Sequence, residues 1–188
     1  TFKISQTSIM TNLNPLHFDN SVFDIYGSIF NKATLVPIEK SEILNCKKLF
    51  SKLKETKCNL WFSVPSLLNL ILKIEKPKIF QKCSIKKIIF GGEKFPIESM
   101  RNVYKYLKNS RIFNVSGPTE CTCMCSAHSV NKKELFQKDN ISVGKINSYF
   151  NYKIAKSDIR KNSSKRGELY LEGPAVSLGY INDKKRTS

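Results

Sequence analysis

The chain has 188 residues, enough for one domain with a hydrophobic core or slightly more than one. A hydrophobic fraction of 40% and an aromatic fraction of 11% are typical of a globular protein and exclude a disordered chain. No apolar run approaches the ~18 residues of a membrane span, and the start of the sequence has no signal-peptide pattern. We therefore expect a cytoplasmic protein with no membrane partner.

Thirty-two Lys and Arg residues against fifteen Asp and Glu residues give a formal net charge of +17. An excess of this size can indicate a nucleic-acid-binding protein. The lysines, however, are scattered as single residues and pairs such as Lys47-Lys48 and Lys86-Lys87, and no block of five or more basic residues occurs. The pattern favours a solvated basic surface, and we predict no specific nucleic-acid partner.

The first half of the chain alternates strand-like and helix-like segments. Short apolar runs predict strands at residues 33–37, 60–62, 85–90 and 111–115. Apolar residues spaced three and four apart predict three amphipathic helices between them, with the inward faces Ile43, Cys46, Phe50 and Leu53; Leu67, Leu68, Ile71 and Ile74; and Ile97, Met100, Tyr104 and Leu107. Ser41 is expected to cap the first helix, which should run unbroken to about Lys57.

Strands that alternate with helices through short connections predict crossover units. The predicted fold class is therefore α/β, an open and mostly parallel sheet with flanking helices. After about residue 130 the pattern changes to short strands, "YFNYKIA" and "GELYLEG", joined by the polar connector 156–166. We expect an α/β core subdomain over residues 1–135 and the beginning of a smaller β-rich subdomain over residues 140–188.

Two loops follow predicted strands at the position where open parallel sheets bind ligands. In "GGEKFP", Gly91 and Gly92 lack Cβ atoms, so the backbone either approaches a ligand closely or simply turns from strand to helix. In "SGPTE", Gly117 and Pro118 form a tight turn whose N–H groups can bind an anion. Thr119 and Glu120 add a hydroxyl for phosphate oxygens and a hard carboxylate that suits magnesium. The alternative is a polar, capped turn.

The six cysteines show no disulfide-framework spacing, which fits a reducing compartment. Cys121, Cys123 and Cys125 alternate, and His128 follows three residues later. This pattern is compatible with zinc, but structural zinc sites usually draw cysteines from C-x₂₋₄-C turns. We expect instead that the three cysteines are small, buried side chains on a central strand.

Two carboxylates lie in "HFDNSVFDIYGSIF". If residues 22–31 form a helix, Asp19 lies near its N-terminus, where a carboxylate can cap it. Alternatively, an aspartate of this segment, Asp19 or Asp24, points into a pocket and binds an ammonium group. His17 is expected to be structural.

Four groups of motifs, in this order, resemble the adenylate-forming enzymes, and within them the amino-acid adenylation domains of nonribosomal peptide synthetases and the D-alanine–carrier-protein ligases. "FDNSVFDIYGSIFNKATLVP" is similar to "FDxSV" with its following helix and strand, and "VPSLL" and "GGEKFP" are similar to the "PS" and "GGExLP" elements. "FNVSGPTE" is similar to "NxYGPTE", and "GELYLEGPAVSLGYIND" to "GELxIxGxxVxxGYxN".

This resemblance implies an enzyme that uses ATP and magnesium. It would activate the carboxylate of an amino acid as an aminoacyl-AMP, release pyrophosphate, and pass the acyl group to the phosphopantetheine thiol of a carrier protein or to coenzyme A. The implied catalytic residues are Thr119 and Glu120, with Glu120 holding magnesium. The implied ATP site comprises Gly91, Gly92, Glu93, Asn114, Val115, Ser116, Gly117, Pro118, Thr119 and Cys123.

The resemblance also implies where the amino acid binds. Asp19 matches the aspartate that binds the α-amino group, which favours an amino acid over a fatty or aryl acid. The implied side-chain pocket comprises Asn20, Phe23, Phe62, Ile89, Gly91, Val115, Cys123 and Met124. The alternatives are an acyl- or aryl-CoA synthetase or, from another class, a basic fragment that binds nucleic acid or serves as a scaffold.

The chain departs from the family pattern in two ways. Ser116 stands where the family usually has tyrosine, so the aromatic platform for adenine is absent at that position. The Ser/Thr/Gly-rich phosphate loop would precede residue 1, and the ribose-binding aspartate and the catalytic lysine of the mobile C-terminal domain would follow residue 188. By itself the chain is therefore expected to be incomplete and inactive.

Overall fold

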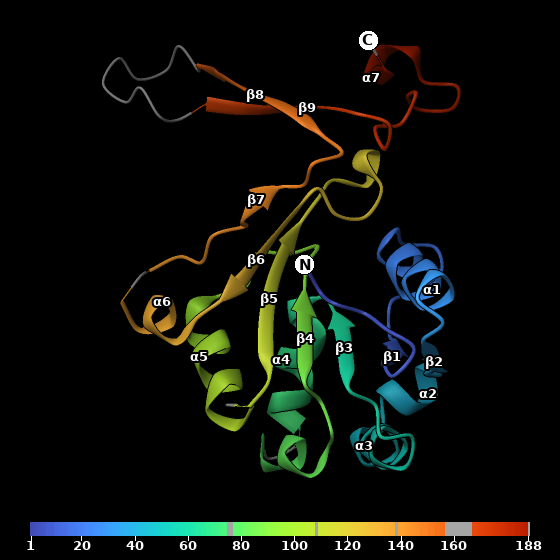
Figure 1. The fold of residues 1–188 in the computed structure, drawn as a ribbon, viewed down its shortest axis with the longest axis vertical. Coiled ribbons are helices and arrows are strands. Elements are labelled where there is room, and N and C mark those ends of the chain that lie inside the picture. Colours follow the sequence, from blue (N-terminus) through green and yellow to red (C-terminus); the bar gives the residue numbers. More distant parts are fainter. Residues whose placement is uncertain (75–76, 108, 138, 157–166, 188) are drawn as a thin grey trace.

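The computed structural model describes residues 1–74, 77–107, 109–137, 139–156 and 167–187. Within them, the strands are β1 (Ile9–Asn12), β2 (Thr34–Pro37), β3 (Leu60–Ser63), β4 (Lys87–Phe90), β5 (Arg111–Ser116), β6 (Ser126–Val130), β7 (Lys145–Ile146), β8 (Asn151–Lys156) and β9 (Gly167–Glu172). The α-helices are α1 (Asn20–Phe30), α2 (Lys40–Ile43), α3 (Cys46–Glu55), α4 (Pro65–Ile74), α5 (Ile97–Tyr106), α6 (Lys132–Gln137) and α7 (Lys184–Thr187). Two 3₁₀ turns, η1 (Pro77–Lys82) and η2 (Thr119–Cys121), complete the set (Figure 1).

The large sheet has the strand order β2-β1-β3-β4-β5-β6-β7. The first five strands in this order pair in parallel with one another, whereas the β5–β6 and β6–β7 pairs are antiparallel. The predicted α/β class with a mostly parallel sheet is therefore confirmed. Strand β1 was not predicted, because its four residues have mixed polarity and it is recognisable only through its pairing with β2 and β3.

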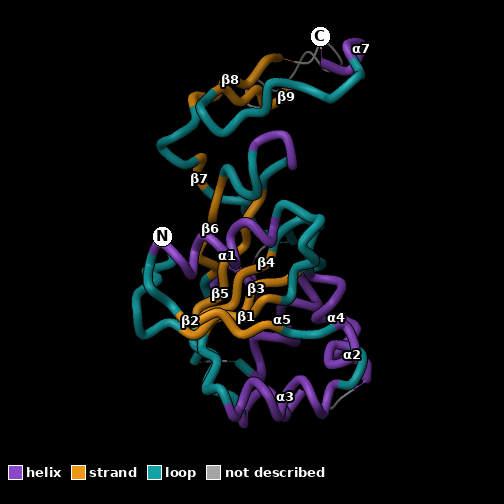
Figure 2. The backbone as a smooth tube through the Cα atoms, turned by 90° about the vertical axis from the view of Figure 1, so that its right-hand side faces the viewer, coloured by secondary structure: helices purple, strands orange, loops and turns teal. Residues whose placement is uncertain are grey.

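Alternation along the central strands divides the core between the two faces of the sheet, because successive side chains of a strand point to opposite sides. Trp61, Ile88 and Ile112 pack with apolar side chains of α3, α4, α5 and α6. Phe62 and Phe113 pack on the other face, where Phe23 of α1 contacts them. Figure 2 shows α1 and α3 on opposite sides of the strands. The result is a helix–sheet–helix arrangement.

The single helix predicted from Ser41 is wrong. The chain forms two helices, α2 and α3, with a break between them at residues 44–45. Glu39 and Glu42 form a reciprocal capping box at the start of α2, and the Asn45 side chain accepts a hydrogen bond from the Lys48 N–H at 3.2 Å at the start of α3. Since an Asn side chain competes with the preceding turn for a backbone donor, a new helix begins there.

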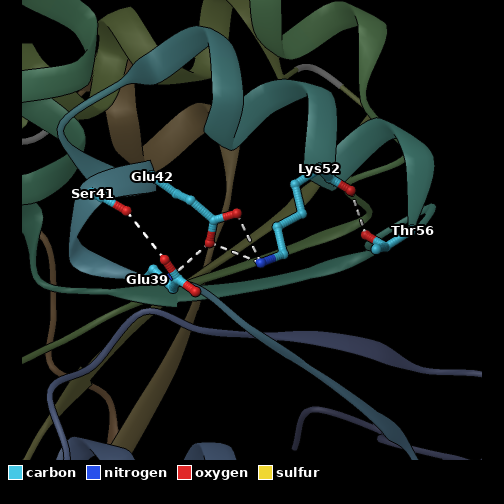
Figure 3. A network of polar contacts seen from close by, with 5 residues as sticks. All are labelled: Glu39, Ser41, Glu42, Lys52 and Thr56. Carbon is cyan, nitrogen blue, oxygen red and sulfur yellow. Dashed lines mark hydrogen bonds and ion pairs between the residues drawn. The ribbon is translucent and has the colours of Figure 1, made fainter.

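A polar network then joins the two helices (Figure 3). The Lys52 ammonium group lies 2.8 and 2.9 Å from the two carboxylate oxygens of Glu42. The Ser41 hydroxyl donates to the Glu39 carboxylate at 3.2 Å, so it serves the capping box and does not cap a helix itself. The Lys52–Glu42 ion pair therefore links α2 and α3 across the break.

The cysteine-rich segment is not the central strand that we expected. Cys121 ends η2, and Thr122 and Cys123 have φ angles of 54° and 73°, so the chain forms an irregular loop before β6. The expected burial is correct. Cys123 packs in the cluster that contains Phe62, whereas Cys121 and Cys125 pack in a different cluster around Phe150. Thiols that point into separate apolar clusters do not suit a shared zinc ion.

The last part of the described chain forms the antiparallel pair β8–β9, at the opposite end of the molecule from α3 (Figure 1). The predicted connector 156–166 lies outside the described residues except at its first position. The segment after β9 returns to the loop at residue 120, where the Ser177 N–H donates to the Glu120 carbonyl at 2.7 Å. The subdomain division between residues 135 and 140 stays a prediction. None of the helices in the described part of the chain has the length and apolar character that a bilayer span requires.

Candidate functional site

The parallel strands β1, β3, β4 and β5 end at the same edge of the sheet, and the loops that follow them surround two adjoining cavities. The first, of about 590 Å³, is called the α1 cavity here and is lined by Leu13, Asn14, Pro15, Phe18, Asp19, Asn20, Ile43, Ser63, Val64, Leu67, Gly92, Glu93, Gly117, Pro118 and Thr119. The second, of about 360 Å³, is called the loop cavity and is lined by Gly92, Glu93, Lys94, Phe95, Asn114, Val115, Ser116, Gly117, Asn140, Ile141 and Val143. Three residues line both. A ligand that spans the two cavities would cross the carboxyl edge of the sheet, where open α/β sheets bind ligands.

Glycine is required where these strands leave the sheet. Gly92 has a φ of +86°, a conformation that other residues rarely adopt. A Cβ on Gly91 would lie 2.5 Å from Cγ2 of Val115, and one on Gly117 would lie 2.6 Å from Cα of Met124. The Gly91-Gly92 pair therefore both turns the chain and allows β4 and β5 to approach each other beside the cavities.

Glu93 holds two of the loops together. Its carboxylate accepts hydrogen bonds from the Ser66 backbone N–H at 3.1 Å and from the Ser66 hydroxyl at 2.9 Å, in the first turn of α4. An acceptor at that position satisfies a donor that the helix leaves unpaired. The "VPSLL" and "GGEKFP" segments, 27 residues apart at this contact, thus form one wall between the two cavities.

Asp19 occupies the position before the first residue of α1, but its side chain makes no capping hydrogen bond. Its carboxylate accepts instead from the Cys123 backbone N–H at 3.1 Å, across 104 residues of sequence, and it lines the α1 cavity. Asn20 is buried beside it, and the Cys123 thiol donates weakly to Asn20 Oδ1 at 3.8 Å. Of the two interpretations of Asp19, the geometry favours the one in which the carboxylate faces a pocket.

The residues of the predicted side-chain pocket lie together. Phe62 and Ile89 are fully buried, Val115 and Cys123 are almost so, and all four belong to one cluster. Phe23 and Met124 pack against it as partly buried side chains. Burial raises the pKa of the Cys123 thiol to about 12, so this thiol is a packed, unreactive side chain and not a nucleophile.

The residues of the "SGPTE" loop and the end of β5 line different cavities. Asn114, Val115 and Ser116 line the loop cavity, and Pro118 and Thr119 line the α1 cavity. Glu120 lies outside the two sets of lining residues, and its carboxylate accepts a hydrogen bond from the Tyr180 hydroxyl. That bond lowers the pKa of Glu120 and raises the pKa of Tyr180.

Sequence reasoning missed residues of both cavities. Asn14 comes from the loop after the unpredicted strand β1, and the segment 140–143 comes from a region with no regular pattern. The Asn114 side chain donates to the Ser142 carbonyl at 2.9 Å, which holds that segment against β5. The one sequence feature that could have indicated these cavity residues is the pair of asparagines in "TNLNP", close to the "FDxSV"-like motif.

His128, considered above as a zinc ligand, contacts a carboxylate away from the cysteines. Its Nε2 atom lies 2.6 Å from the Glu134 carboxylate, between β6 and α6. Within the described residues, no group of three or more His, Cys, Asp or Glu side chains is arranged to hold a metal ion.

Comparison with known proteins agrees with this architecture. The chain matches the model of the family described as "AMP-binding enzyme" over residues 1–181. It is 31% identical over 187 residues to the D-alanine--D-alanyl carrier protein ligase of Bacillus cereus (strain G9842), covering 99% of this chain and 37% of that protein. It is 30% identical over 191 residues to bacitracin synthase 1 of Bacillus licheniformis, covering 98% of this chain and 4% of that protein.

Solved structures share the fold. CmiS6 superposes with a TM-score of 0.89 at 23% identity, covering 99% of this chain and 45% of that one. The nonribosomal peptide synthetase FmoA3 superposes with a TM-score of 0.80 at 25% identity, covering 100% of this chain and 20% of that one. The chain spans little more than a third of the length of the D-alanyl carrier protein ligase that it matches. On the evidence of its sequence motifs, its sheet and a family match over residues 1–181, the chain belongs to the AMP-binding enzyme family.

Proposed function

We propose that this chain is part of an ATP-dependent ligase that activates the carboxylate of an amino acid as an aminoacyl-AMP and then transfers it to a carrier-protein thiol. The observation that carries the proposal is the pair of adjoining cavities, one lined by Asp19 and Thr119 and the other by Asn114 and Ser116. Two relatives support it by name, a D-alanyl carrier protein ligase and a peptide synthase. FmoA3 has been solved in AMPPNP-bound and α-methyl-L-serine-AMP-bound forms.

The reaction would proceed in two steps. In the first, a carboxylate oxygen of the amino acid forms a bond to the α-phosphorus of ATP, and the bond from that phosphorus to the bridging oxygen breaks, so pyrophosphate leaves with the electron pair. In the second, a thiolate attacks the acyl carbon and AMP leaves. Coenzyme A is the alternative thiol acceptor.

The residues of the two cavities suit the two substrates of this reaction, ATP and the amino acid. The loop cavity, with the Asn114 and Ser116 side chains on β5, would take the nucleotide. Gly117 lines both cavities and Thr119 lines the α1 cavity, so the turn and the Thr119 hydroxyl would bind phosphate oxygens. Asp19 would bind the ammonium group, above the apolar cluster around Phe62.

The loop offers one carboxylate to a magnesium ion, that of Glu120, next in sequence to Thr119 of the α1 cavity. A single carboxylate together with phosphate oxygens is a common magnesium environment in nucleotide enzymes. Glu120 is such a carboxylate, and the Tyr180 hydroxyl keeps its pKa low, so the group is ionised at neutral pH. Glu120 would hold the ion, and bound magnesium would neutralise charge on the phosphates.

The test is ATP–pyrophosphate exchange by the full-length protein with a panel of amino acids. We expect exchange with at least one amino acid, a loss of about 100-fold or more in Glu120→Ala, and a rise of about 100-fold in KM for the amino acid in Asp19→Ala. Glu55→Ala, an exposed carboxylate on α3, is the matched control and should behave as wild type. Absence of exchange with every amino acid would refute the proposal. An unchanged KM in Asp19→Ala would favour an acyl- or aryl-CoA synthetase.

A further inference from the structure

Asp24 is a fully buried carboxylate on the inner face of α1 to which the reaction above gives no role. Its Oδ2 atom accepts hydrogen bonds from Asn12 Nδ2 at 3.3 Å, from Asn14 Nδ2 at 3.0 Å and from the Asn14 backbone N–H at 3.4 Å. Its Oδ1 atom has no partner within the described residues. A buried carboxylate is costly unless it is hydrogen-bonded, so three donors converging on one oxygen indicate a site whose geometry is fixed.

Those contacts determine how the Asn14 amide is oriented. Nδ2 of Asn14 donates to Asp24 Oδ2 and also to the Phe62 carbonyl at 3.3 Å, at the end of β3. Both neighbours are acceptors, so only the NH₂ side of the amide can face them. The amide oxygen therefore points away from Asp24 and Phe62, and it has no hydrogen-bond partner within the described part of the chain.

That free acceptor belongs to a residue of the α1 cavity. Asn14 is 5% exposed and lines this cavity together with Asp19 and Asn20. One oxygen of the Asp19 carboxylate already accepts from the Cys123 N–H. An ammonium group carries three donors and is satisfied by several acceptors in different directions. A neutral acceptor in the same cavity as Asp19 can accept one of these donors without adding a second charge.

We propose that Asn14 Oδ1 is a second acceptor for the ammonium group of the substrate, and that Asp24 is the positioning residue that holds the Asn14 amide in this orientation. The inference rests on the proposed function and extends it. It predicts that the α1 cavity selects amine-bearing carboxylic acids over their hydroxy and desamino analogues through two residues, Asp19 and Asn14.

Asp24 can fill this role in either ionisation state. Burial raises its pKa to about 7, so near neutral pH it is partly protonated. With the proton on the unpartnered Oδ1, the Oδ2 atom still accepts from Asn14. Asp24→Asn, whose amide oxygen can take the place of Oδ2, should therefore preserve the Asn14 orientation, whereas Asp24→Leu should release it.

The experiment compares Asn14→Ala with Asn12→Ala in the full-length protein. Asn12 donates to the same Asp24 oxygen but is not among the residues that line the α1 cavity, so it controls for damage to the network. KM in ATP–pyrophosphate exchange is measured for the preferred amino acid and for ATP. Calorimetry measures binding of that amino acid and of its α-hydroxy analogue. Asn14→Ser, which keeps a donor beside Asp24 but lacks the amide oxygen, is tested in parallel in case Asn14→Ala does not fold.

We expect Asn14→Ala and Asn14→Ser to weaken amino-acid binding and raise its KM by about tenfold or more, with KM for ATP and binding of the α-hydroxy analogue unchanged. Asn12→Ala and Asp24→Asn should stay within about threefold of wild type, since both retain the Asn14 acceptor. Equal effects in the Asn14 and Asn12 variants, or equal losses for the amino acid and its analogue, would overturn the inference. If wild-type protein shows no exchange with any amino acid, the proposed function itself fails.

Discussion

Asp19 and Asp24 lie five residues apart and experience opposite environments. Asp19 is partly exposed at the start of α1 and accepts a hydrogen bond from the Cys123 backbone N–H, 104 residues further along the chain. Asp24 is one and a half turns further along, fully buried, and surrounded by the asparagines after β1. Burial disfavours the charged form of a carboxyl group, and this is the largest cause of the raised pKa of Asp24.

Asp24 should therefore make stability depend on pH. Its pKa rises from 3.8 to about 7 on folding, so between these values the unfolded chain loses a proton that the folded chain keeps. The free energy of unfolding should fall as the pH rises through this window, by up to about 4 kcal/mol, and then level off. Asp24→Asn removes the titration, so its stability relative to wild type should increase from pH 4 to pH 8. Urea unfolding at several pH values measures this difference, and a constant difference would contradict the assignment.

Helix α1 has its polar face inward. It buries Asn20, Ser21, Asp24 and Ser28, while Ile29 and Phe30 are 61% and 79% exposed. The serines can be buried because each hydroxyl donates to the carbonyl three residues earlier, Ser21 to Phe18 at 2.8 Å and Ser28 to Ile25 at 2.7 Å. Apolar spacing alone would have placed the wrong face of this helix on the sheet.

The break between α2 and α3 predicts how substitution of single capping residues changes stability. Asn45→Ala removes the acceptor for the Lys48 N–H and should lower the free energy of unfolding by about 1 kcal/mol. Ser41→Ala should change it by less than about 0.5 kcal/mol, because that hydroxyl is exposed and caps no helix. Chemical denaturation measures the free energy of unfolding of both variants. A larger decrease in Ser41→Ala than in Asn45→Ala would contradict the two caps and favour the single predicted helix.

Cationic side chains lie together at the beginnings of β4 and β5. Lys87 and Arg111 are paired in register at the beginnings of β4 and β5, and the Lys87 ammonium group donates to the Lys3 carbonyl at 2.7 Å. Burial, followed by these neighbouring cations, lowers the pKa of Lys87. The carboxylates Asp19 and Glu93, by contrast, line the cavities at the other edge of the sheet. The cavities thus lie at the opposite edge of the sheet from Lys87 and Arg111.

The net charge of +17 should therefore support only non-specific contact with nucleic acid. In gel-shift titrations with duplexes of unrelated sequence, we expect weak complexes at low salt that disappear near 0.15 M salt, as counterion release requires. A sequence-selective complex that persists at that ionic strength would contradict this expectation and favour the nucleic-acid alternative.

Much of the architecture was predictable because it depends on local order. The six predicted strands and the helices α4 and α5 follow from the pattern of neighbouring residues, and the loops with Gly91 and Gly117 follow from their place after strands. The break at Asn45 and the irregular loop at Cys123 were missed, since caps and positive φ angles override apolar spacing.

The sequence by itself determined the fold class, the order of the motifs and the membership of the family. Only the tertiary structure decided that β1 pairs between β2 and β3, that the Asp19 carboxylate accepts from the Cys123 backbone, and that the Asp24 carboxylate accepts from the Asn14 amide. Periodicity and motif spacing are properties of adjacent residues, whereas these contacts join segments 10 to 104 residues apart. Their geometry exists only once the sheet and α1 have packed together.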